Sequence, residues 1–448
     1  MARKPVIFIP GFVGSELHNR TTGEVLFPPP LIKLLDPAKK AALLAQLRAV
    51  PGNVEAGLPI ASLLGGIVQE AQSIYNILRD QFGYDVTFTS PDFIPVGWDW
   101  RQGVGATPTI DSITDALDEL SPQKNGNVVG IIHSAGGLVL RAFLERKPAY
   151  AACFEQLLTF GAPWAGTLEA LHAVTQGVSI KFLFIKLLTN AEGQGLMGRA
   201  VSAYDLFPTD PSLGLFFDAA GAPTTPLTDQ SWITQQFMRD AAAQAHAPFP
   251  QQFGALPVTN VCGWGAPTLK KASINAATGK VAFEAKDKEI GDGTVPFASA
   301  AWLRGANVRS MFLPIGAYAT GFLPKVHGQL WDSPPVLQLF DEVLGTSAKA
   351  PFLCAAADSD DYIDFSRPFR LRVSAMAGDG SPLPNLRINA DINGNRIPIP
   401  LLADNKRGMR PISRSGIRHN IGSDLFRFMV EFSWTGGSDK RAVLIRST

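Results

Sequence analysis

The stretch that decides the fold is Val128-Val129-Gly130-Ile131-Ile132-His133-Ser134-Ala135-Gly136-Gly137. Its apolar beginning predicts a buried strand, and Leu138–Arg146, which follows it, has the spacing of an amphipathic helix. A serine on the tight turn between a strand and a helix projects its hydroxyl above the edge of a sheet, and small neighbours let the helix approach closely. The segment therefore predicts an α/β protein with Ser134 as a candidate nucleophile.

One residue departs from the full G-x-S-x-G pattern of such a turn. Ile132 stands where the pattern has a small residue, and a β-branched side chain there would crowd the turn. A serine in this position could also do no more than cap the following helix. Both interpretations of Ser134 remain open on these residues alone.

Short apolar runs alternate with helical patterns through the first 350 residues, which predicts a parallel sheet with helices on both faces. The expected strands are Val6–Ile9, Val86–Thr89, Val128–Ile132, Leu157–Phe160, Val258–Val261 and Ser310–Pro314. Capping residues and proline in the first turn mark the expected helices, which begin at Asp36-Pro37, Thr107, Ser134 and Ser333-Pro334.

The alternation stops between Thr167 and about Gly254, where we expect a helical cap inserted into the sheet. Within it, Ile180–Leu188 and Ser231–Ala245 look helical, and the first is either an amphipathic lid for a lipid surface or buried cap core. We therefore predict one α/β domain over 1–350, with its cap at about 167–254.

The last 90 or so residues form a different pattern. Period-two alternation in Phe369–Ala375, Leu386–Ile392 and Phe426–Phe432 is typical of strands. Turn signals at Asp379-Gly380 and Asn393-Gly394 separate them. These features predict a small C-terminal β-sandwich over 359–448, for which a solvated accessory role is expected.

The composition excludes several classes of protein. The chain has 448 residues, 46% of them hydrophobic, and a formal net charge of +1, so we expect a globular protein and no nucleic-acid partner. It has no apolar stretch long enough for a transmembrane helix and no recognisable signal segment, so a cytoplasmic location is expected for the sequence as written. The three cysteines and the histidines lack metal-ligand spacing, so we expect no metal and no cofactor.

A nucleophilic serine needs an adjacent base that a carboxylate orients. Two histidines follow any suitable acid, and His327 is favoured over His419 because it lies between the last sheet strand and the final helix of the domain. The acid candidate is Asp292, whose flanking glycines permit a sharp loop, although Asp-Gly on its own is most often only a turn.

The remaining requirement is an oxyanion hole, formed by backbone N–H groups that face the developing negative charge. Ala135, next to the nucleophile, would supply one amide. Phe12, in the glycine-flanked loop after the first strand, would supply the other. Trp164 follows a strand whose carboxyl end should face the site, so it either lines an acyl pocket or packs in the core.

Taken together, seven motifs resemble the lecithin:cholesterol acyltransferase-like branch of the α/β-hydrolases, which includes lysosomal phospholipase and bacterial lipases. They occur in the family's order and span residues 5–345. The matching stretches are Ile9–Ser15, Gly97–Arg101, His133–Gly137, Gly161–Thr167, Ser202–Pro208, Gly265–Thr268 and Gly291–Pro296. The tail lies outside this resemblance, and its run 379–385 loosely resembles a bacterial immunoglobulin-like module.

The resemblance implies an α/β-hydrolase fold with a mostly parallel sheet, an inserted cap and a mobile lid. It also implies Ser134, Asp292 and His327 as a triad, Phe12 and Ala135 as oxyanion donors, and lipid-like carboxylic esters as substrates. The expected activity is hydrolysis through a covalent acyl-enzyme, with transient contact between the cap and a lipid surface. Two alternatives remain: an acyltransferase using the same triad, and a non-catalytic scaffold that binds a ligand or partner.

Overall fold

The computed structural model divides into two compact units, which we describe separately. One unit holds residues 4–309 and 315–331, and the other holds 1–3, 310–314 and 332–448. The predicted domain limits at 350 and 359 stay a prediction. The structure describes residues 3–60, 62–63, 68–69, 72–87, 92–178, 180–182, 185–250, 253–314, 327–345, 352–358, 369–376, 382–392, 395–401, 407–412 and 425–446.

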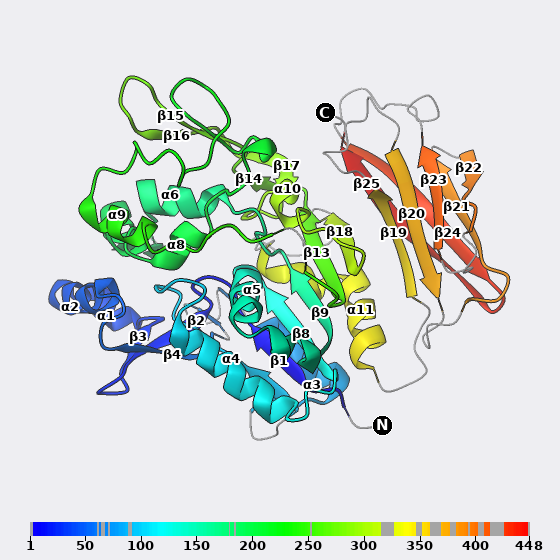
Figure 1. The fold of residues 1–448 in the computed structure, drawn as a ribbon, viewed down its shortest axis with the longest axis horizontal. Helices are drawn as coiled ribbons and strands as arrows, with labels where there is room; N and C mark the ends of the chain where they lie inside the picture. Colours follow the sequence, from blue (N-terminus) through cyan, green and yellow to red (C-terminus); the bar gives the residue numbers. More distant parts are fainter. Residues whose placement is uncertain are drawn as a thin grey trace. The chain divides into compact units, whose positions relative to one another are not determined.

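The central sheet has the strand order β18-β13-β9-β8-β1-β7, and β1, β7, β8, β9 and β13 lie in the first unit; β1, β8, β9 and β13 are labelled in Figure 1. The pairings β1–β7, β1–β8, β8–β9 and β9–β13 are all parallel. The six strands are β1 (Val6–Ile9), β7 (Phe93–Pro95), β8 (Val128–His133), β9 (Phe154–Phe160), β13 (Val258–Trp264) and β18 (Val308–Pro314). The predicted α/β class is therefore confirmed.

Helices cover both faces of this sheet because successive side chains of a strand point in opposite directions. Ile7 and Ile9 of β1 belong to the same buried cluster as Ile110 of α4 (Thr107–Leu120) and Leu138 of α5 (Gly136–Arg146). Phe8, between the two isoleucines, points the other way and meets the ring of Tyr75 in α3 (Gln72–Phe82) at 6.0 Å. Each face of β1 is thus closed by its own helices.

One predicted strand is misplaced. Val86 and Thr87 lie in a turn, and residues 88–89 fall outside the described residues. The strand beside β1 is instead β7, which ends in Pro95 opposite Phe8. Proline cannot donate a ladder hydrogen bond, but β7 is the edge of the sheet, where no neighbour needs that donor.

The segment between β9 and β13, where the cap is predicted, leaves the central sheet and contains less helix than expected. Ile180–Leu188 is not a helix: β10 (Ile180–Phe182) pairs antiparallel with β11 (Ile185–Leu188). Of the expected helix at 231–245, only α9 (Gln236–Ala242) is helical. The other helices of the cap are α6 (Leu168–Gln176), α7 (Asn190–Met197) and α8 (Val201–Asp205).

Two further excursions leave the central sheet. Between β1 and β7, a small antiparallel sheet has the order β3-β2-β4, and Asp36 caps the N-terminus of α2 by accepting from the amides of Ala38 and Lys39. Between β13 and β18, short strands form the β12-β15-β16 and β14-β17 sheets. The bounds of these elements are β2 (Ser15–Asn19), β3 (Val25–Phe27), α1 (Leu31–Leu35), α2 (Pro37–Arg48), β4 (Val54–Pro59), β12 (Phe216–Phe217), β14 (Ala266–Thr268), β15 (Ala272–Ile274), β16 (Val281–Phe283), β17 (Asp287–Gly291) and α10 (Phe297–Ala300).

The second unit contains α11 (Pro334–Leu344) and two antiparallel sheets, β19-β20-β23 and β22-β21-β24-β25. The expected strands at 369–375, 386–392 and 426–432 are all present. The turn signals Asp379-Gly380 and Asn393-Gly394 lie outside the described residues. The strands are β19 (Phe352–Asp358), β20 (Phe369–Met376), β21 (Arg387–Ile392), β22 (Asn395–Pro398), β23 (Arg407–Ile412), β24 (Leu425–Trp434) and β25 (Gly437–Arg446).

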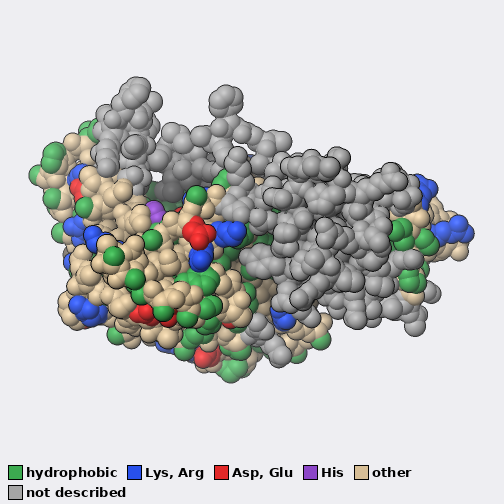
Figure 2. All heavy atoms as spheres, turned by 90° about the horizontal axis from the view of Figure 1, so that it is seen from above, with side chains coloured by type: hydrophobic (Ala, Val, Ile, Leu, Met, Phe, Trp, Pro, Cys, Tyr) green, Lys and Arg blue, Asp and Glu red, His purple; other side chains and the backbone are tan. Residues whose placement is uncertain are grey.

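The described surface mixes both signs of charge. On the face drawn in Figure 2, blue basic and red acidic side chains are interspersed among hydrophobic and neutral atoms. Among the helices within the described ranges, none combines the length and the apolar character needed to cross a bilayer.

Candidate active site

Ser134 occupies a strained turn between β8 and α5. Its φ of +51° lies in the left-handed region, which residues with a Cβ rarely adopt. The backbone N–H of Ser134 donates to the carbonyl oxygen of Phe160 at 2.8 Å, which ties the turn to the end of β9. Strain of this kind concentrates at functional sites, so the turn makes Ser134 a candidate functional residue.

The glycines after Ser134 permit a close approach of α5. A Cβ on Gly136 would lie 2.6 Å from the carbonyl oxygen of Ile9, and one on Gly137 would lie 2.8 Å from the Cβ of Ala162. Neither position has room for a side chain. The small residues of the motif are therefore required by packing at the head of the helix.

Ile132 does not crowd this turn. It is a regular member of β8, opposite Ile9 on one side and Thr159 on the other, and its side chain is fully buried in the core. The sharp change of direction comes two residues later, at Ser134. The core side of the strand therefore accommodates the β-branched residue.

Asp292 is fully buried in the loop between β17 and α10. Its Oδ1 accepts hydrogen bonds from the amides of Thr294 at 3.0 Å and Val295 at 2.7 Å. Gly293, at φ +95°, closes the loop by donating its own amide to Thr268 Oγ1 at 2.9 Å. The loop thus fixes one carboxylate oxygen with backbone donors and leaves the other for a side chain.

That other oxygen meets His327, the first residue of a 3₁₀ helix (His327–Asp332). The distance from His327 Nδ1 to Asp292 Oδ2 is 2.6 Å, which is a short hydrogen bond. Because an ionised carboxylate only accepts, Nδ1 donates, and Nε2 is the nitrogen able to take up a proton. The alternative, His419, lies outside the described residues.

Two glycines show that Ser134, Asp292 and His327 converge. A Cβ on Gly161, directly after the Phe160 that binds Ser134, would lie 2.8 Å from Asp292 Oδ2 and 2.9 Å from His327 Cε1. On the opposite side, a Cβ on Gly11 would lie 2.8 Å from the Cβ of Ser134. The three predicted residues thus gather at the carboxyl ends of β8 and β9, with glycine backbone pressed against them.

His133, directly before Ser134, supports His327. Its Nε2–H donates to the carbonyl oxygen of His327 at 3.2 Å, and the two rings lie 4.9 Å apart. The indole of Trp331 packs edge-on against His133 at 4.8 Å. Burial, followed by the charge of His327, lowers the pKa of His133 to about 3, so it is neutral at physiological pH.

The two predicted oxyanion donors have backbone amides free for a ligand. Within the described part of the chain, neither the Phe12 nor the Ala135 amide donates to a protein acceptor. The Phe12 loop is a tight turn in which the amide of Gly14 donates to the carbonyl of Gly11 at 3.1 Å, and Val13 sits at φ +60°. A β-branched residue in that conformation marks a second strained turn beside Ser134.

The loop Gly97–Arg101, which we call the tryptophan loop, holds the Phe12 turn. Trp98 Nε1 donates to the carbonyl of Pro10 at 3.0 Å, and the amide of Trp98 donates to Ser15 Oγ at 3.0 Å. The ring of Trp100 packs edge-on against Phe12 at 5.7 Å. Both ends of the turn are therefore anchored to the segment that follows β7.

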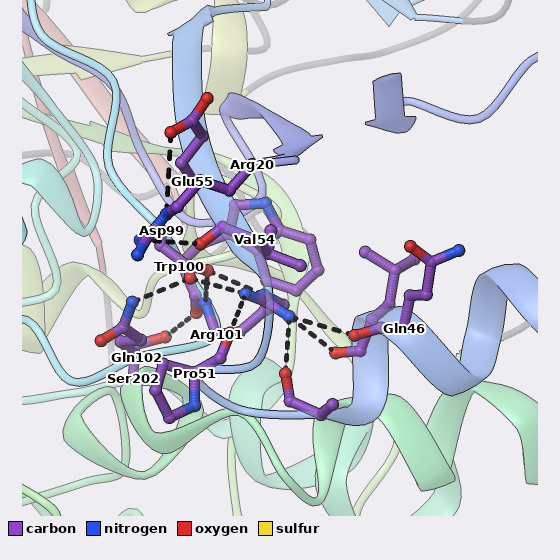
Figure 3. A network of polar contacts seen from close by, with 12 residues as sticks. Arg20, Gln46, Pro51, Val54, Glu55, Asp99, Trp100, Arg101, Gln102 and Ser202 are labelled. Atoms are coloured by element: carbon purple, nitrogen blue, oxygen red, sulfur yellow. Dashed lines mark hydrogen bonds and ion pairs between the residues drawn. The ribbon is translucent and has the colours of Figure 1, made fainter. Parts of the chain in front are cut away.

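Within the same loop, Asp99 and Arg101 form a buried ion pair (Figure 3). Arg101 Nη2 lies 2.7 Å from Asp99 Oδ2, and the guanidinium also donates to the carbonyls of Leu47, Ala49 and Pro51. The pair thus joins the end of α2 to the tryptophan loop.

Trp164 is packed in the core. Trp164 is only 4% exposed, and its indole N–H donates to Asn260 Oδ1 at 3.1 Å. The ring lies edge-on to Phe253 at 5.7 Å and against Gly137. These contacts show that Trp164 packs in the core. Its place in a substrate pocket stays a prediction.

The arrangement of Ser134, His327 and Asp292 is suited to nucleophilic chemistry. Across the ranges that the structure describes, no three or more histidine, cysteine, aspartate or glutamate side chains gather as a metal site. A serine on a strained turn, a histidine with a buried carboxylate partner and two available amides are the parts of a triad with an oxyanion hole.

Residues 71–241 match the family described as lecithin:cholesterol acyltransferase. This similarity covers less than half of the chain and supports a lecithin:cholesterol acyltransferase-like α/β-hydrolase. The family match covers Ser134 and most of the cap, whereas Asp292 and His327 lie beyond it. The assignment of those two residues therefore rests on geometry and chain order.

Two relatives of this chain carry the name lysosomal phospholipase A and acyltransferase. The one from Mus musculus is 26% identical over 172 residues, which is 37% of this chain and 40% of the relative. The one from Rattus norvegicus is 26% identical over 106 residues, or 23% and 25%. The chain thus spans less than half the length of the curated relatives it matches.

Among solved structures, the crystal structure of a Tle4-Tli4 complex aligns with a TM-score of 0.46 and 13% identity. The alignment covers 75% of this chain and 97% of that one.

Proposed function

We propose that this protein is a serine hydrolase that cleaves lipid-like carboxylic esters through a covalent acyl-enzyme. The observation that carries the proposal is the buried Asp292–His327 hydrogen bond of 2.6 Å beside the strained turn of Ser134. A decayed binding scaffold has no chemical reason to keep a nucleophile, a base and an orienting acid together.

In the proposed mechanism, Ser134 Oγ attacks the ester carbonyl carbon while His327 Nε2 takes its proton. Asp292 holds the imidazole in the required tautomer and stabilises the imidazolium. The amides of Phe12 and Ala135 bind the negative oxygen of the tetrahedral intermediate. His327 then returns the proton to the leaving alcohol, and a water molecule, activated by the same base, hydrolyses the acyl-enzyme.

The proposed substrate class rests on the similarity to proteins named as phospholipases and acyltransferases. We propose that the cap over 167–254 contributes to ester selection and that its β10–β11 hairpin meets the lipid surface. Because this segment is a hairpin and not the expected helix, it would present the edge of a short strand to that surface.

Acyl transfer is a second candidate because both relatives carry that activity in their names. The same acyl-enzyme yields transfer when an alcohol reaches it in place of water. Product analysis with a long-chain alcohol present measures the ratio of ester to free acid, and free acid alone would exclude this candidate.

The direct test is hydrolysis of p-nitrophenyl esters with acyl chains from two to sixteen carbons. The wild type should show turnover that Ser134→Ala and His327→Ala abolish, and the acyl-length optimum should identify the ester class. Ser112→Ala is the matched control, since Ser112 is exposed on α4 and donates only to the carbonyl of Pro108.

Two outcomes would count against the proposal. Full turnover by both triad variants would show that the triad is wrong. Silence of the wild type at every chain length, and on phospholipid vesicles as well, would favour the non-catalytic scaffold.

A further inference from the structure

A cavity of about 440 Å³ lies in the first unit, and Ser134, Asp292 and His327 are not among the residues that line it. Its walls come from the end of α2, the loop before α4, and the cap helices α8 and α9, which can be followed in Figure 1. Its volume is in the range of small-molecule sites. None of the predicted site residues lines this cavity, so the cavity has no role in the mechanism proposed above.

Three arginines line this cavity: Arg48, Arg146 and Arg199. They come from α2, α5 and the segment between α7 and α8, so chain segments far apart in sequence bring their charges together. Within the part of the chain that the structure describes, none of the three lies within 4.0 Å of a carboxylate. Arginine is otherwise commonly neutralised by an ion pair, as Arg101 is here.

Protein contacts position two of these guanidinium groups but use only some of their N–H donors. Arg48 Nη2 donates to the carbonyl of Glu192 at 3.2 Å, while its buried Nε has no acceptor among the described residues. Arg199 Nη1 donates to the carbonyl of Gly195 at 2.7 Å, and its guanidinium lies 3.7 Å from the centre of the Phe237 ring. Each guanidinium has five N–H donors, so most remain available for a ligand.

The two arginines also repel each other. Burial, and then the positive charge of Arg48, lowers the pKa of Arg199 below its usual value. An arginine nevertheless stays charged near neutral pH. Two like charges held together in this way are stabilised when an anion binds between them.

The acidic groups of the cavity have other partners. Asp205 accepts from the amides of Val104 at 2.8 Å and His246 at 2.5 Å, one with each carboxylate oxygen. Asp240 accepts from Gln236 at 2.7 Å. His246, which also lines the cavity, lies 3.5 Å from Glu145. The carboxylates therefore shape the walls and leave the arginines without neutralisation.

We propose that this cavity binds the phosphoryl group of a small molecule or a lipid headgroup, held by Arg48, Arg146 and Arg199. Guanidinium forks match the geometry of phosphate oxygens, and three positive charges suit a doubly charged anion. The cavity lies beside the tryptophan loop through its neighbours Gln102 and Gly103, so occupancy would also stabilise the segment that holds the Phe12 turn.

Isothermal titration calorimetry at constant ionic strength tests the site with two probes, inorganic phosphate and sn-glycerol 3-phosphate. We expect saturable binding to the wild type and affinity at least about tenfold weaker in Arg48→Gln and in Arg199→Gln. Arg20→Gln is the matched control, because Arg20 is an exposed arginine that pairs with Glu55 outside the cavity. Thermal unfolding of each variant shows that it is folded.

Sedimentation with phosphatidylcholine vesicles, with or without phosphatidic acid, separates the two sources of the phosphoryl group. Binding of the soluble probes that both cavity variants lose supports a small phosphorylated ligand. Binding confined to phosphatidic acid vesicles, and lost in both variants, supports a lipid headgroup. No binding of any probe, or binding that both variants retain in full, would overturn the proposal.

Discussion

The contact of Gly161 with the acid–base pair makes a sharp test of the site. Gly161 has φ +58°, and a Cβ placed on it would lie 2.8 Å from Asp292 Oδ2, 2.9 Å from His327 Cε1 and 3.0 Å from His327 Nδ1. Real Cβ atoms do not approach other heavy atoms so closely, so the imidazole or the carboxylate has to move in Gly161→Ala. The substitution changes no polar group of the triad.

Two costs can be separated for this substitution. The left-handed conformation costs an alanine about 1 to 2 kcal/mol of folding stability. The displaced acid–base pair has a kinetic cost, because a misplacement of about 1 Å in an active site lowers the rate on the order of a hundredfold. We therefore expect kcat/KM for ester hydrolysis to fall about a hundredfold.

Gly23→Ala is the matched control because Gly23 has φ +68° and a Cβ added to it would have no heavy atom within 4 Å. It should lose about the same stability in urea unfolding and keep its esterase rate. Urea unfolding and steady-state kinetics on both variants complete the comparison. Activity of Gly161→Ala within a few-fold of wild type would refute the placement of Asp292 and His327 against this backbone.

Three further predictions concern the turn, the buried ion pair and the buried histidine. Ser134→Gly relieves the φ of +51° that Ser134→Ala retains, so urea unfolding should find the glycine variant more stable by about 1 kcal/mol, although both are inactive; equal stability would argue against strain at the turn. Arg101→Met leaves the buried Asp99 carboxylate unpaired and should lower the free energy of unfolding by about 3 to 5 kcal/mol, whereas an effect as small as that of Arg20→Gln would contradict the assigned role of the ion pair. Because the pKa of His133 is lowered from 6.5 to about 3, the unfolded chain binds a proton there that the folded protein does not, so stability falls as pH drops from 6.5 toward 3; His133→Asn should flatten this dependence by up to about 1.4 kcal/mol per pH unit, and an unchanged slope would contradict the buried neutral histidine.

Most of the central sheet could be predicted because its strands are long apolar runs bounded by turn residues. The exception is instructive. Val86–Thr89 has the β-branched composition of a strand, whereas Phe93-Ile94-Pro95 is short and ends in proline. Only the edge position of β7 makes the proline acceptable, and edge position is a property of the assembled sheet.

The cap was harder to predict. Ile180–Leu188 is apolar enough for either a buried helix or a hairpin, and periodicity does not separate the two in so short a run. Antiparallel pairing of Lys181 with Lys186 and of Phe182 with Ile185 selects the hairpin. That selection depends on tertiary surroundings that the local sequence does not encode.

The contact between Asp292 and His327 could be predicted from chain order and chemistry, but the residues that surround it could not. Asp292 and His327 lie 35 residues apart and are joined by one hydrogen bond, as their order after Ser134 suggested. Gly161, and the contact of His133 with the His327 carbonyl, could not be found in this way. Both depend on which backbone segment packs behind the site. The only sequence signal for Gly161 is that it directly follows a predicted strand.

The central claim is that Ser134 is the nucleophile, and covalent labelling tests it most directly. The protein would be incubated with a fluorophosphonate ester, and the intact mass and the modified peptide would be determined, with Ser134→Ala in parallel. We predict one adduct per chain, located on Ser134 and absent from the variant. An adduct on another residue, or equal labelling of Ser134→Ala, would contradict the account.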